Sequence, residues 1–185
     1  MTVPGVIRIG VAVTVPEPFC SALTAARARV GDPGAELIRP HITLIGPTEV
    51  PVSGLDEVDA HLRAVAGRHA PFTVHLRGTA SFRPVSPVVF VEVVEGIAPC
   101  ERLERELRTG ALAQDLRFHY HPHVTVAHEV DDAALDSAFV DLAEFDARFE
   151  VPVIQAYEHG DDGMWRARGS YPLAGVPDAG PGDAS

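Results

Sequence analysis

Apolar and polar positions alternate along the chain in a way that predicts strands and helices in turn. Residues Val6–Val13 are rich in β-forming residues with a weak alternation, which predicts a strand that ends near Pro16. A helix is expected from about Pro18 to Val30, before a turn cluster of glycine, aspartate and proline. A second strand is expected over Leu37–Ile45, with Gly46-Pro47 as its end.

The remaining chain continues this mixture of helices and strands. Leu55–Arg68 carries apolar residues at helical spacing, which predicts a helix with one buried stripe. Further helices are expected over Ala98–Leu116 and from Asp131 or Asp132 to Leu142, and further strands over Phe72–Leu76, Val88–Val94, Ala147–Ala156 and Trp165–Tyr171.

One five-residue pattern occurs twice, as Pro40-His41-Ile42-Thr43-Leu44 and as Pro122-His123-Val124-Thr125-Val126. In a strand, residues two apart share a face, so each histidine lies beside its threonine while the apolar residues between and after them point the other way. The second copy falls within a predicted strand in His119–His128. The pattern predicts a site built from two histidines and two hydroxyls, one pair from each half of the chain.

Histidine and threonine suit chemistry at a phosphate. The histidine pKa lies near neutral pH, so His41 and His123 can divide the work of general acid and general base. Hydroxyl groups donate to phosphate oxygens without adding charge, so Thr43 and Thr125 can hold the phosphate while charge shifts in the transition state. This chemistry requires no metal and no other cofactor.

Length and composition are those of an ordinary globular protein. The 185 residues suffice for one domain or one body of two similar lobes, and 46% of them are hydrophobic. No apolar run approaches the roughly 20 residues of a membrane-spanning helix, and no export signal is evident. Cys20 and Cys100 lack metal-ligand spacing and are expected to be reduced thiols. We therefore expect a cytoplasmic monomer that does not bind membranes, with residues 1–174 as one domain and 175–185 as a loose tail.

Charge limits the class of partner. The formal net charge is −11, and all fifteen basic side chains are arginine. Tight binding to long nucleic acid depends on a wide basic surface, so it is not expected. A short ligand that carries phosphate remains compatible with this charge, because a few arginines can bind phosphate locally.

Three further residues are weaker candidates for substrate contacts. Arg39 lies two residues before His41 and would share its face if the strand ran through Pro40, whereas a solvated edge residue is an equally good interpretation. Phe82 and Phe90 could stack a base, although strand aromatics more often belong to the core.

An alternative site lies beside the second pentad. His119, His121 and His123 alternate, so a strand would place all three on one face as a possible metal constellation. This interpretation predicts a metal-dependent hydrolase, but it leaves the first pentad unexplained. A second alternative is a module that binds a nucleotide without turning it over.

The two pentads resemble the paired His-x-Thr-x motifs of the 2H phosphoesterase superfamily, which contains bacterial RNA 2',5'-ligases and cyclic phosphodiesterases. Residues Ser81–Val93 are similar to the segment between the two motifs, and Phe118–His123 to the approach to the second. The resemblance extends over nearly the whole chain up to Leu173.

This resemblance implies an α+β fold with two lobes, in which two antiparallel sheets face a central groove and helices pack outside. It also implies metal-independent chemistry on a 2',3'-cyclic or 2',5'-linked phosphodiester. By position, His41 and His123 correspond to the acid and base pair, and Thr43 and Thr125 to the phosphate hydroxyls. Neither the substrate nor the role of each histidine is determined by the resemblance.

Overall fold

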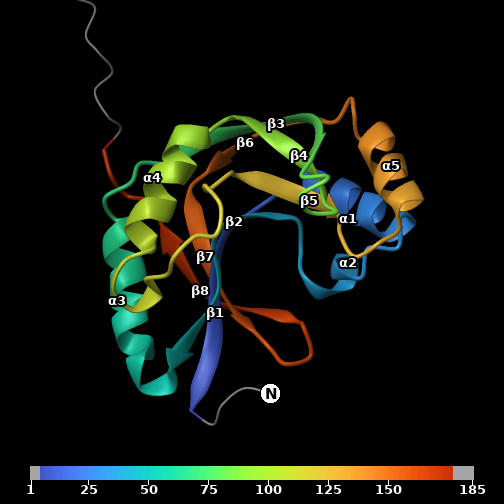
Figure 1. Cartoon of the computed structure of the whole chain (residues 1–185). Helices are drawn as coiled ribbons and strands as arrows, with labels where there is room; N and C mark the ends of the chain where they lie inside the picture. The colour runs from blue at the N-terminus through green and yellow to red at the C-terminus, as the bar shows by residue number, and fades with distance from the viewer. Residues whose placement is uncertain (1–4, 177–185) are drawn as a thin grey trace, which may run out of the picture.

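Two antiparallel four-stranded sheets form the centre of the computed structural model, which describes residues 5–176 (Figure 1). The first sheet has the order β2 (His41–Pro51), β1 (Val6–Thr14), β7 (Val153–His159) and β8 (Trp165–Pro172). The second has the order β5 (His123–Ala127), β4 (Val89–Glu95), β3 (Phe72–Ser81) and β6 (Asp146–Val151). The predicted α+β class with two antiparallel sheets is confirmed.

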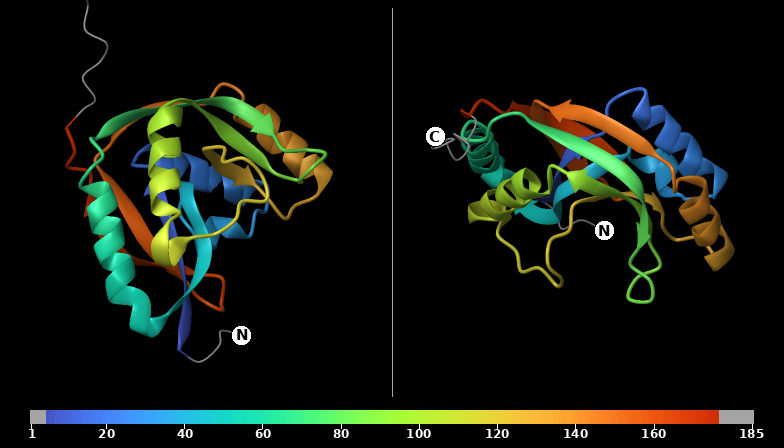
Figure 2. Two further views of the ribbon diagram at one scale, coloured as in Figure 1. Left: turned by 60° about the vertical axis from the view of Figure 1, so that its left-hand side comes forward. Right: turned by 90° about the horizontal axis from the view of Figure 1, so that it is seen from above.

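The helices lie outside the sheets in two groups. In both Figure 1 and Figure 2, α3 and α4 lie on one side of the molecule, and α1, α2 and α5 lie on the other. Their bounds are α1 (Phe19–Arg29), α2 (Gly34–Leu37), α3 (Leu55–Ala66), α4 (Ile97–Leu107) and α5 (Asp132–Asp141). Among the described residues, no helix is both long and apolar enough to cross a membrane.

Burial follows the alternation of the sequence in both pentads. Ile42 is fully buried and Leu44 is 3% exposed, whereas His41 and Thr43 are half-buried. In the second pentad Val124 and Val126 are fully buried. Because apolar burial is the main stabilising contribution to a sheet, it fixes which face each histidine occupies.

Both pentad strands are edge strands. β2 ends the first sheet and β5 ends the second, and the two strands contact each other where the sheets meet. Two segments about eighty residues apart in the sequence are therefore adjacent in the fold.

The first pentad strand differs from its predicted bounds at both ends. Gly34–Leu37 forms the short helix α2, so the strand begins only at His41. It then continues through Gly46-Pro47 to Pro51. Ile9 pairs with Thr48 and Val11 with Ile45, which leaves Gly46 and Pro47 opposite the single residue Gly10 as a bulge. An edge strand tolerates proline, because only one of its sides is hydrogen-bonded.

Two other predicted elements are wrong in extent. The strand expected over Ala147–Ala156 is two strands, β6 and β7, which belong to different sheets. Pro152 lies between them, at the point where the chain passes from the second sheet to the first. The helix expected to reach Leu116 ends at Leu107.

Several predicted details agree with the structure. Asp131 caps α5, since its side chain accepts a hydrogen bond of 2.8 Å from the Ala134 N–H. Cys20 and Cys100 are both buried free thiols. Most of the expected loose tail, residues 177–185, lies outside the described residues. At its start, the Gly175 N–H donates to the His69 carbonyl at 2.9 Å.

Candidate active site

His41 is the first residue of β2, and its ring is oriented by the main chain. Nδ1 lies 2.8 Å from the carbonyl oxygen of Arg39. A carbonyl can only accept, so Nδ1 carries a hydrogen and donates it. In the neutral ring Nε2 is then unprotonated, and it accepts a hydrogen bond of 3.1 Å from the Thr43 hydroxyl.

His123 begins β5 and has the same arrangement. Its Nδ1 donates to the carbonyl of His121 at 2.6 Å, which is again the carbonyl two residues earlier. The neutral ring therefore also has its lone pair on Nε2. The two pentads thus present histidines in the same tautomer from the two sheets.

The surroundings favour the neutral form of both rings. Burial lowers the pKa of His41 to about 4 despite the hydrogen bond to Arg39, and the charges of Arg27 and His123 lower it further. Burial likewise lowers the pKa of His123, and the neighbouring His121 adds to the effect. The two rings stand at the starts of two edge strands that contact each other.

Thr43 and Thr125 lie beside their histidines, as the period of two predicts. Thr43 pairs in register with Ala12 of β1, and Thr125 pairs with Phe90 of β4. Both are half-buried. Each side chain therefore lies on the same face of its strand as the preceding histidine.

Tyr120 joins the approach to the second pentad to the first pentad. Its hydroxyl donates to the carbonyl of Thr43 at 2.9 Å. Burial raises the pKa of this phenol, so it stays protonated and remains a donor. The hydrogen bond fixes the segment before His123 against β2. No pattern in the sequence marks Tyr120 as a site residue.

Phe82 and Phe90 surround His123. The centroid of each phenyl ring lies 5.0 Å from that of the His123 ring, and the two phenyl rings are 4.3 Å apart. Phe90 is only 3% exposed, so it belongs to the core. Phe82 is half-buried at the start of the β3–β4 loop. Both limit how the imidazole can rotate.

Arg39 does not lie on the strand face of His41, because β2 begins after it. Its side chain is exposed and forms an ion pair with Glu17 at 3.1 Å. It lines a cavity next to His41, so the structure places it near the candidate site but not on the strand.

The histidines of the alternative metal site do not share a strand. His119 and His121 precede β5 and are exposed. The rings of His121 and His123 stack with centroids 6.1 Å apart, whereas His119 lies with Arg117 and Arg108 around a separate surface hollow. Within residues 5–176, no group of three or more histidine, cysteine or carboxylate side chains is placed to hold a metal ion.

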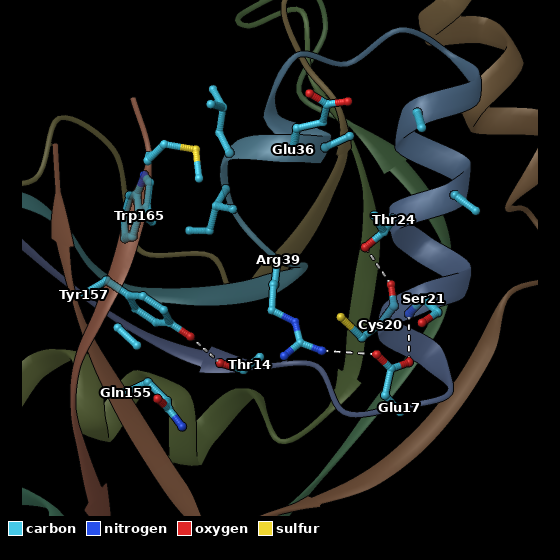
Figure 3. A pocket seen from close by; sticks show the side chains of 17 residues that line it. Thr14, Glu17, Cys20, Ser21, Thr24, Glu36, Arg39, Gln155, Tyr157 and Trp165 are labelled. Carbon is cyan, nitrogen blue, oxygen red and sulfur yellow. Dashed lines mark hydrogen bonds and ion pairs between the residues drawn. The ribbon is translucent and has the colours of Figure 1, made fainter. Parts of the chain in front are cut away.

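A cavity of about 700 Å³ lies between the first sheet, α1 and α2 (Figure 3). Neither His41 nor His123 lines it, but Trp165 does, and the Trp165 ring lies 5.7 Å from that of His41. Tyr157, Gln155 and Thr14 also line the cavity, and the Tyr157 and Thr14 hydroxyls are 2.7 Å apart.

No repeated pattern in the sequence marks these cavity residues, although one glycine offers a signal. Gly10 interrupts an otherwise β-rich strand, and an isolated glycine in a strand often marks a close approach. A Cβ at Gly10 would lie 2.4 Å from Cζ3 of Trp165. The missing side chain is what allows the indole to lie on β1 beside His41.

A histidine and a threonine on each of two edge strands that contact each other are the arrangement expected of a two-histidine phosphoesterase. The family model described as the 2'-5' RNA ligase superfamily matches residues 15–163. The chain belongs to this superfamily.

Curated relatives agree with this assignment. A Bacillus cytotoxicus protein named "Putative phosphoesterase" is 36% identical over 102 residues, which cover 55% of this chain and 59% of the relative. A protein of Bacillus mycoides with the same designation is 28% identical over 144 residues, covering 77% of this chain and 83% of that protein.

Solved structures show the same fold. Escherichia coli LigT in its apo form superposes with a TM-score of 0.69 at 19% identity, covering 91% of this chain and 98% of that one. Its complex with 3'-AMP gives a TM-score of 0.68 at 20% identity, with the same coverage. At this identity the likeness concerns the fold alone.

Proposed function

We propose that the protein is a metal-independent phosphodiesterase that acts on a 2',3'-cyclic or 2',5'-linked phosphodiester of a nucleotide or an RNA end. The observation that supports this most is the matched geometry of His41 and His123. Both rings are held in the same tautomer by the main chain, at the starts of two edge strands that contact each other. Membership of the superfamily supports the same reaction class.

The two histidines take opposite roles in the proposed hydrolysis. His41 has a pKa of about 4, so it is neutral over most of the pH range and serves as the base. Its Nε2 accepts a proton from water as the water oxygen attacks phosphorus. The bond from phosphorus to a ribose oxygen breaks, and protonated His123 gives that oxygen its Nε2 proton. The product is a phosphomonoester, and solvent restores the two protonation states.

The threonines bind the phosphate in this mechanism. Thr43 donates to Nε2 of His41 in the free protein, and it can turn the same hydroxyl toward a phosphate oxygen once substrate is bound. Thr125 has the corresponding place on β5. Two neutral donors stabilise the growing negative charge without lowering the pKa of either histidine further.

Turnover of a panel of 2',3'-cyclic nucleotides and 2',5'-linked dinucleotides in the presence of a chelator tests the proposal. The wild type should retain activity, and His41→Ala and His123→Ala should each lose about 10²–10⁴-fold in kcat, because each removes one proton-transfer partner. His119→Ala is the matched control, since its side chain is an exposed histidine of the same segment and lines a separate surface hollow. This control should stay within a few-fold of wild type.

Two other outcomes would each support a different class of protein. Loss of activity in chelator together with loss in His119→Ala and His121→Ala would support the metal-dependent hydrolase. Nucleotide binding without turnover of any substrate in the panel would support a binding module. Either result would contradict the proposed acid and base pair.

A further inference from the structure

Residues 113–122 connect the 3₁₀ helix η2 (Gly110–Leu112) to β5, and they form neither a helix nor a strand. Two of their side chains nevertheless donate hydrogen bonds to β2. The Gln114 amide donates to the Thr48 hydroxyl at 2.9 Å, and the Tyr120 hydroxyl donates to the Thr43 carbonyl at 2.9 Å. In Figure 1 this segment, drawn in yellow, runs past β2 before it enters β5. The segment therefore attaches the second pentad to the first pentad strand.

The two hydrogen bonds differ in what else holds the chain beside them. The main-chain carbonyl of Gln114 also accepts from Arg108 at 3.2 Å, and Arg108 is paired with the buried carboxylate of Glu104. At Tyr120 the ring packs against the core and the hydroxyl binds Thr43. Within residues 5–176, β2 and β5 belong to different sheets, so no ladder of main-chain hydrogen bonds joins the two pentads. The Tyr120 hydroxyl supplies a hydrogen bond between them.

This hydrogen bond joins the residues that orient the two histidine rings. The Thr43 side chain binds Nε2 of His41, and the Thr43 carbonyl accepts from Tyr120. Tyr120 is followed by His121, whose carbonyl accepts the hydrogen on Nδ1 of His123. A displacement of Tyr120 relative to Thr43 would therefore move His123 relative to His41, while each ring kept its own tautomer.

The Tyr120 hydroxyl acts through its neighbours, because its hydrogen is donated to a carbonyl. Burial raises the pKa of this phenol, and the charges of Cys100, Glu104 and Glu101 raise it further. The hydroxyl therefore stays protonated at neutral pH and remains a donor. Its contribution is one of position, since it takes no part in proton transfer.

We propose that Tyr120 is a positioning residue that sets the separation of His41 and His123, so that the acid reaches the leaving oxygen of a phosphate bound beside the base. This inference rests on the proposed phosphodiesterase function and adds the residue that aligns its acid with its base. Proton transfer requires about 2.6–3.2 Å between the two heavy atoms. A misplacement of about 1 Å can lower a rate about 10²-fold.

Tyr120→Phe tests the proposal, because it removes the hydroxyl and keeps the ring that packs against the core. Two substrates separate its effect on the acid from its effect on the rest of the site. The leaving ribose oxygen of a nucleoside 2',3'-cyclic phosphate needs a proton, whereas the nitrophenolate of a 3'-deoxynucleoside 2'-(4-nitrophenyl phosphate) leaves without one. For the cyclic nucleotide, kcat should fall about 10- to 100-fold with KM within a few-fold. For the nitrophenyl ester, kcat should stay within a few-fold of wild type.

His123→Ala is the reference for this comparison, because it removes the acid itself. It should lose far more activity on the cyclic nucleotide than on the nitrophenyl ester. Tyr120→Phe should show the same preference in a weaker form. Equal losses of Tyr120→Phe on both substrates, or no loss on either, would overturn the positioning role, since a purely structural role lowers both rates together.

Gln114→Leu is the matched control. It removes the other hydrogen bond between the same segment and β2, at Thr48 and outside the pentad. Activity on both substrates should stay within a few-fold of wild type, and urea denaturation should give similar midpoints for Gln114→Leu and Tyr120→Phe. A loss on the cyclic nucleotide equal to that of Tyr120→Phe would show that any loosening of the segment has the same effect, and it would overturn the particular role of Tyr120.

Binding measures the alignment without turnover. A nucleoside and vanadate together form a five-coordinate analogue of the transition state, which contacts acid and base at once. In calorimetric titrations Tyr120→Phe should weaken binding of this analogue by about the same factor as kcat, and should bind inorganic phosphate within a few-fold of wild type. Equal affinity of wild type and variant for the analogue would overturn the inference. No turnover of either substrate by the wild type would contradict the proposed function instead, and the vanadate titration would still decide whether Tyr120 aligns the two rings.

Discussion

At the scale of single residues, the tautomers of His41 and His123 are set by the main chain. In each case Nδ1 donates to the carbonyl two residues earlier, that of Arg39 or His121. Because these acceptors are main-chain carbonyls, a side-chain substitution that leaves the backbone in place does not remove them. The Nε2 atom of both rings is therefore available for proton transfer, whatever side chain stands at positions 39 and 121.

The pH dependence of kcat/KM should be bell-shaped, with its maximum on the acid side of neutrality. His41 as base must be neutral, so the rate rises as the pH passes its pKa of about 4. His123 as acid must be protonated, so the rate falls as the pH passes its pKa, which lies below the ordinary value of 6.5. Steady-state kinetics on a 2',3'-cyclic nucleotide would measure both limbs.

The pH dependence of the activity that remains in His41→Ala and in His123→Ala shows which histidine is the base and which is the acid. His123→Ala should keep only the rising limb near pH 4, because His41 still has to be neutral. His41→Ala should keep only the falling limb. A falling limb near pH 4 in His123→Ala would exchange the two roles, since His41 would then act in its protonated form.

At the scale of elements, a buried ion pair fixes the segment that leads into β2. Arg27 on α1 binds Asp32 at 3.1 Å, and both residues are only 5% exposed. The same guanidinium donates to the carbonyl of Ile38 at 3.0 Å, immediately before the Arg39 carbonyl that orients His41. The Asp32 carboxylate also accepts from the Gly34 N–H at the start of α2. This pair joins α1, α2 and the first pentad.

Asp32→Ala should lower the free energy of unfolding by about 3–5 kcal/mol, because it leaves the Arg27 charge buried without its partner. Chemical denaturation followed by circular dichroism would measure it. The matched control is Arg63→Ala, which removes an exposed ion pair with Asp59 and should cost no more than about 1 kcal/mol. Similar losses in the two variants would show that the buried pair has no special role.

The elements that sequence reasoning located correctly are those whose period is set by one buried face. The helix α3 shows this, since its residues Val58, Leu62 and Val65 are buried at the expected spacing. The division at Pro152 could not be found in this way, because β6 and β7 are both β-rich and only their partners differ. Likewise, the sequence predicted that β2 ends at Gly46-Pro47. The strand continues past these residues through a bulge opposite Gly10, and that bulge depends on the register with β1, which one sequence does not reveal.

The candidate site could be located from the sequence only in part. His41, Thr43, His123 and Thr125 follow from a repeated local pattern, and they lie on the two edge strands that contact each other, whereas their part in catalysis stays a prediction. Trp165 and Tyr157 have no such pattern. They reach the site only because β7 and β8 extend the sheet that begins with β2 and β1. Their place depends on strand order, which one sequence does not reveal.

At the scale of the whole molecule, the site lies on a strongly acidic protein. The net charge of −11 repels a polyanion, whereas a mononucleotide brings little charge to the surface. Exposed carboxylates such as Glu17 and Glu36 line the cavity itself. The charge balance therefore favours a short substrate over a long one.

Ionic strength should change the preference between short and long substrates. At low salt, kcat/KM for a dinucleotide ending in a 2',3'-cyclic phosphate should exceed that for an oligonucleotide with the same end, because repulsion slows association of the longer chain. Added salt should reduce the difference, since it screens that repulsion. Kinetics at low and high ionic strength would measure the ratio. A preference for the oligonucleotide that weakens with salt would instead reveal a basic binding surface.

The strand order of the first sheet also determines at what point during synthesis this sheet can be completed. β1 lies between β2, which follows soon after it, and β7, which begins only at Val153. A chain emerging from the ribosome must therefore expose one side of β1 until β7 has been made. Pairings this distant in sequence make folding slow, and an open strand edge can bind other chains in the meantime. The arrangement that places Trp165 beside His41 thus comes with a long interval during synthesis in which one edge of β1 has no partner strand.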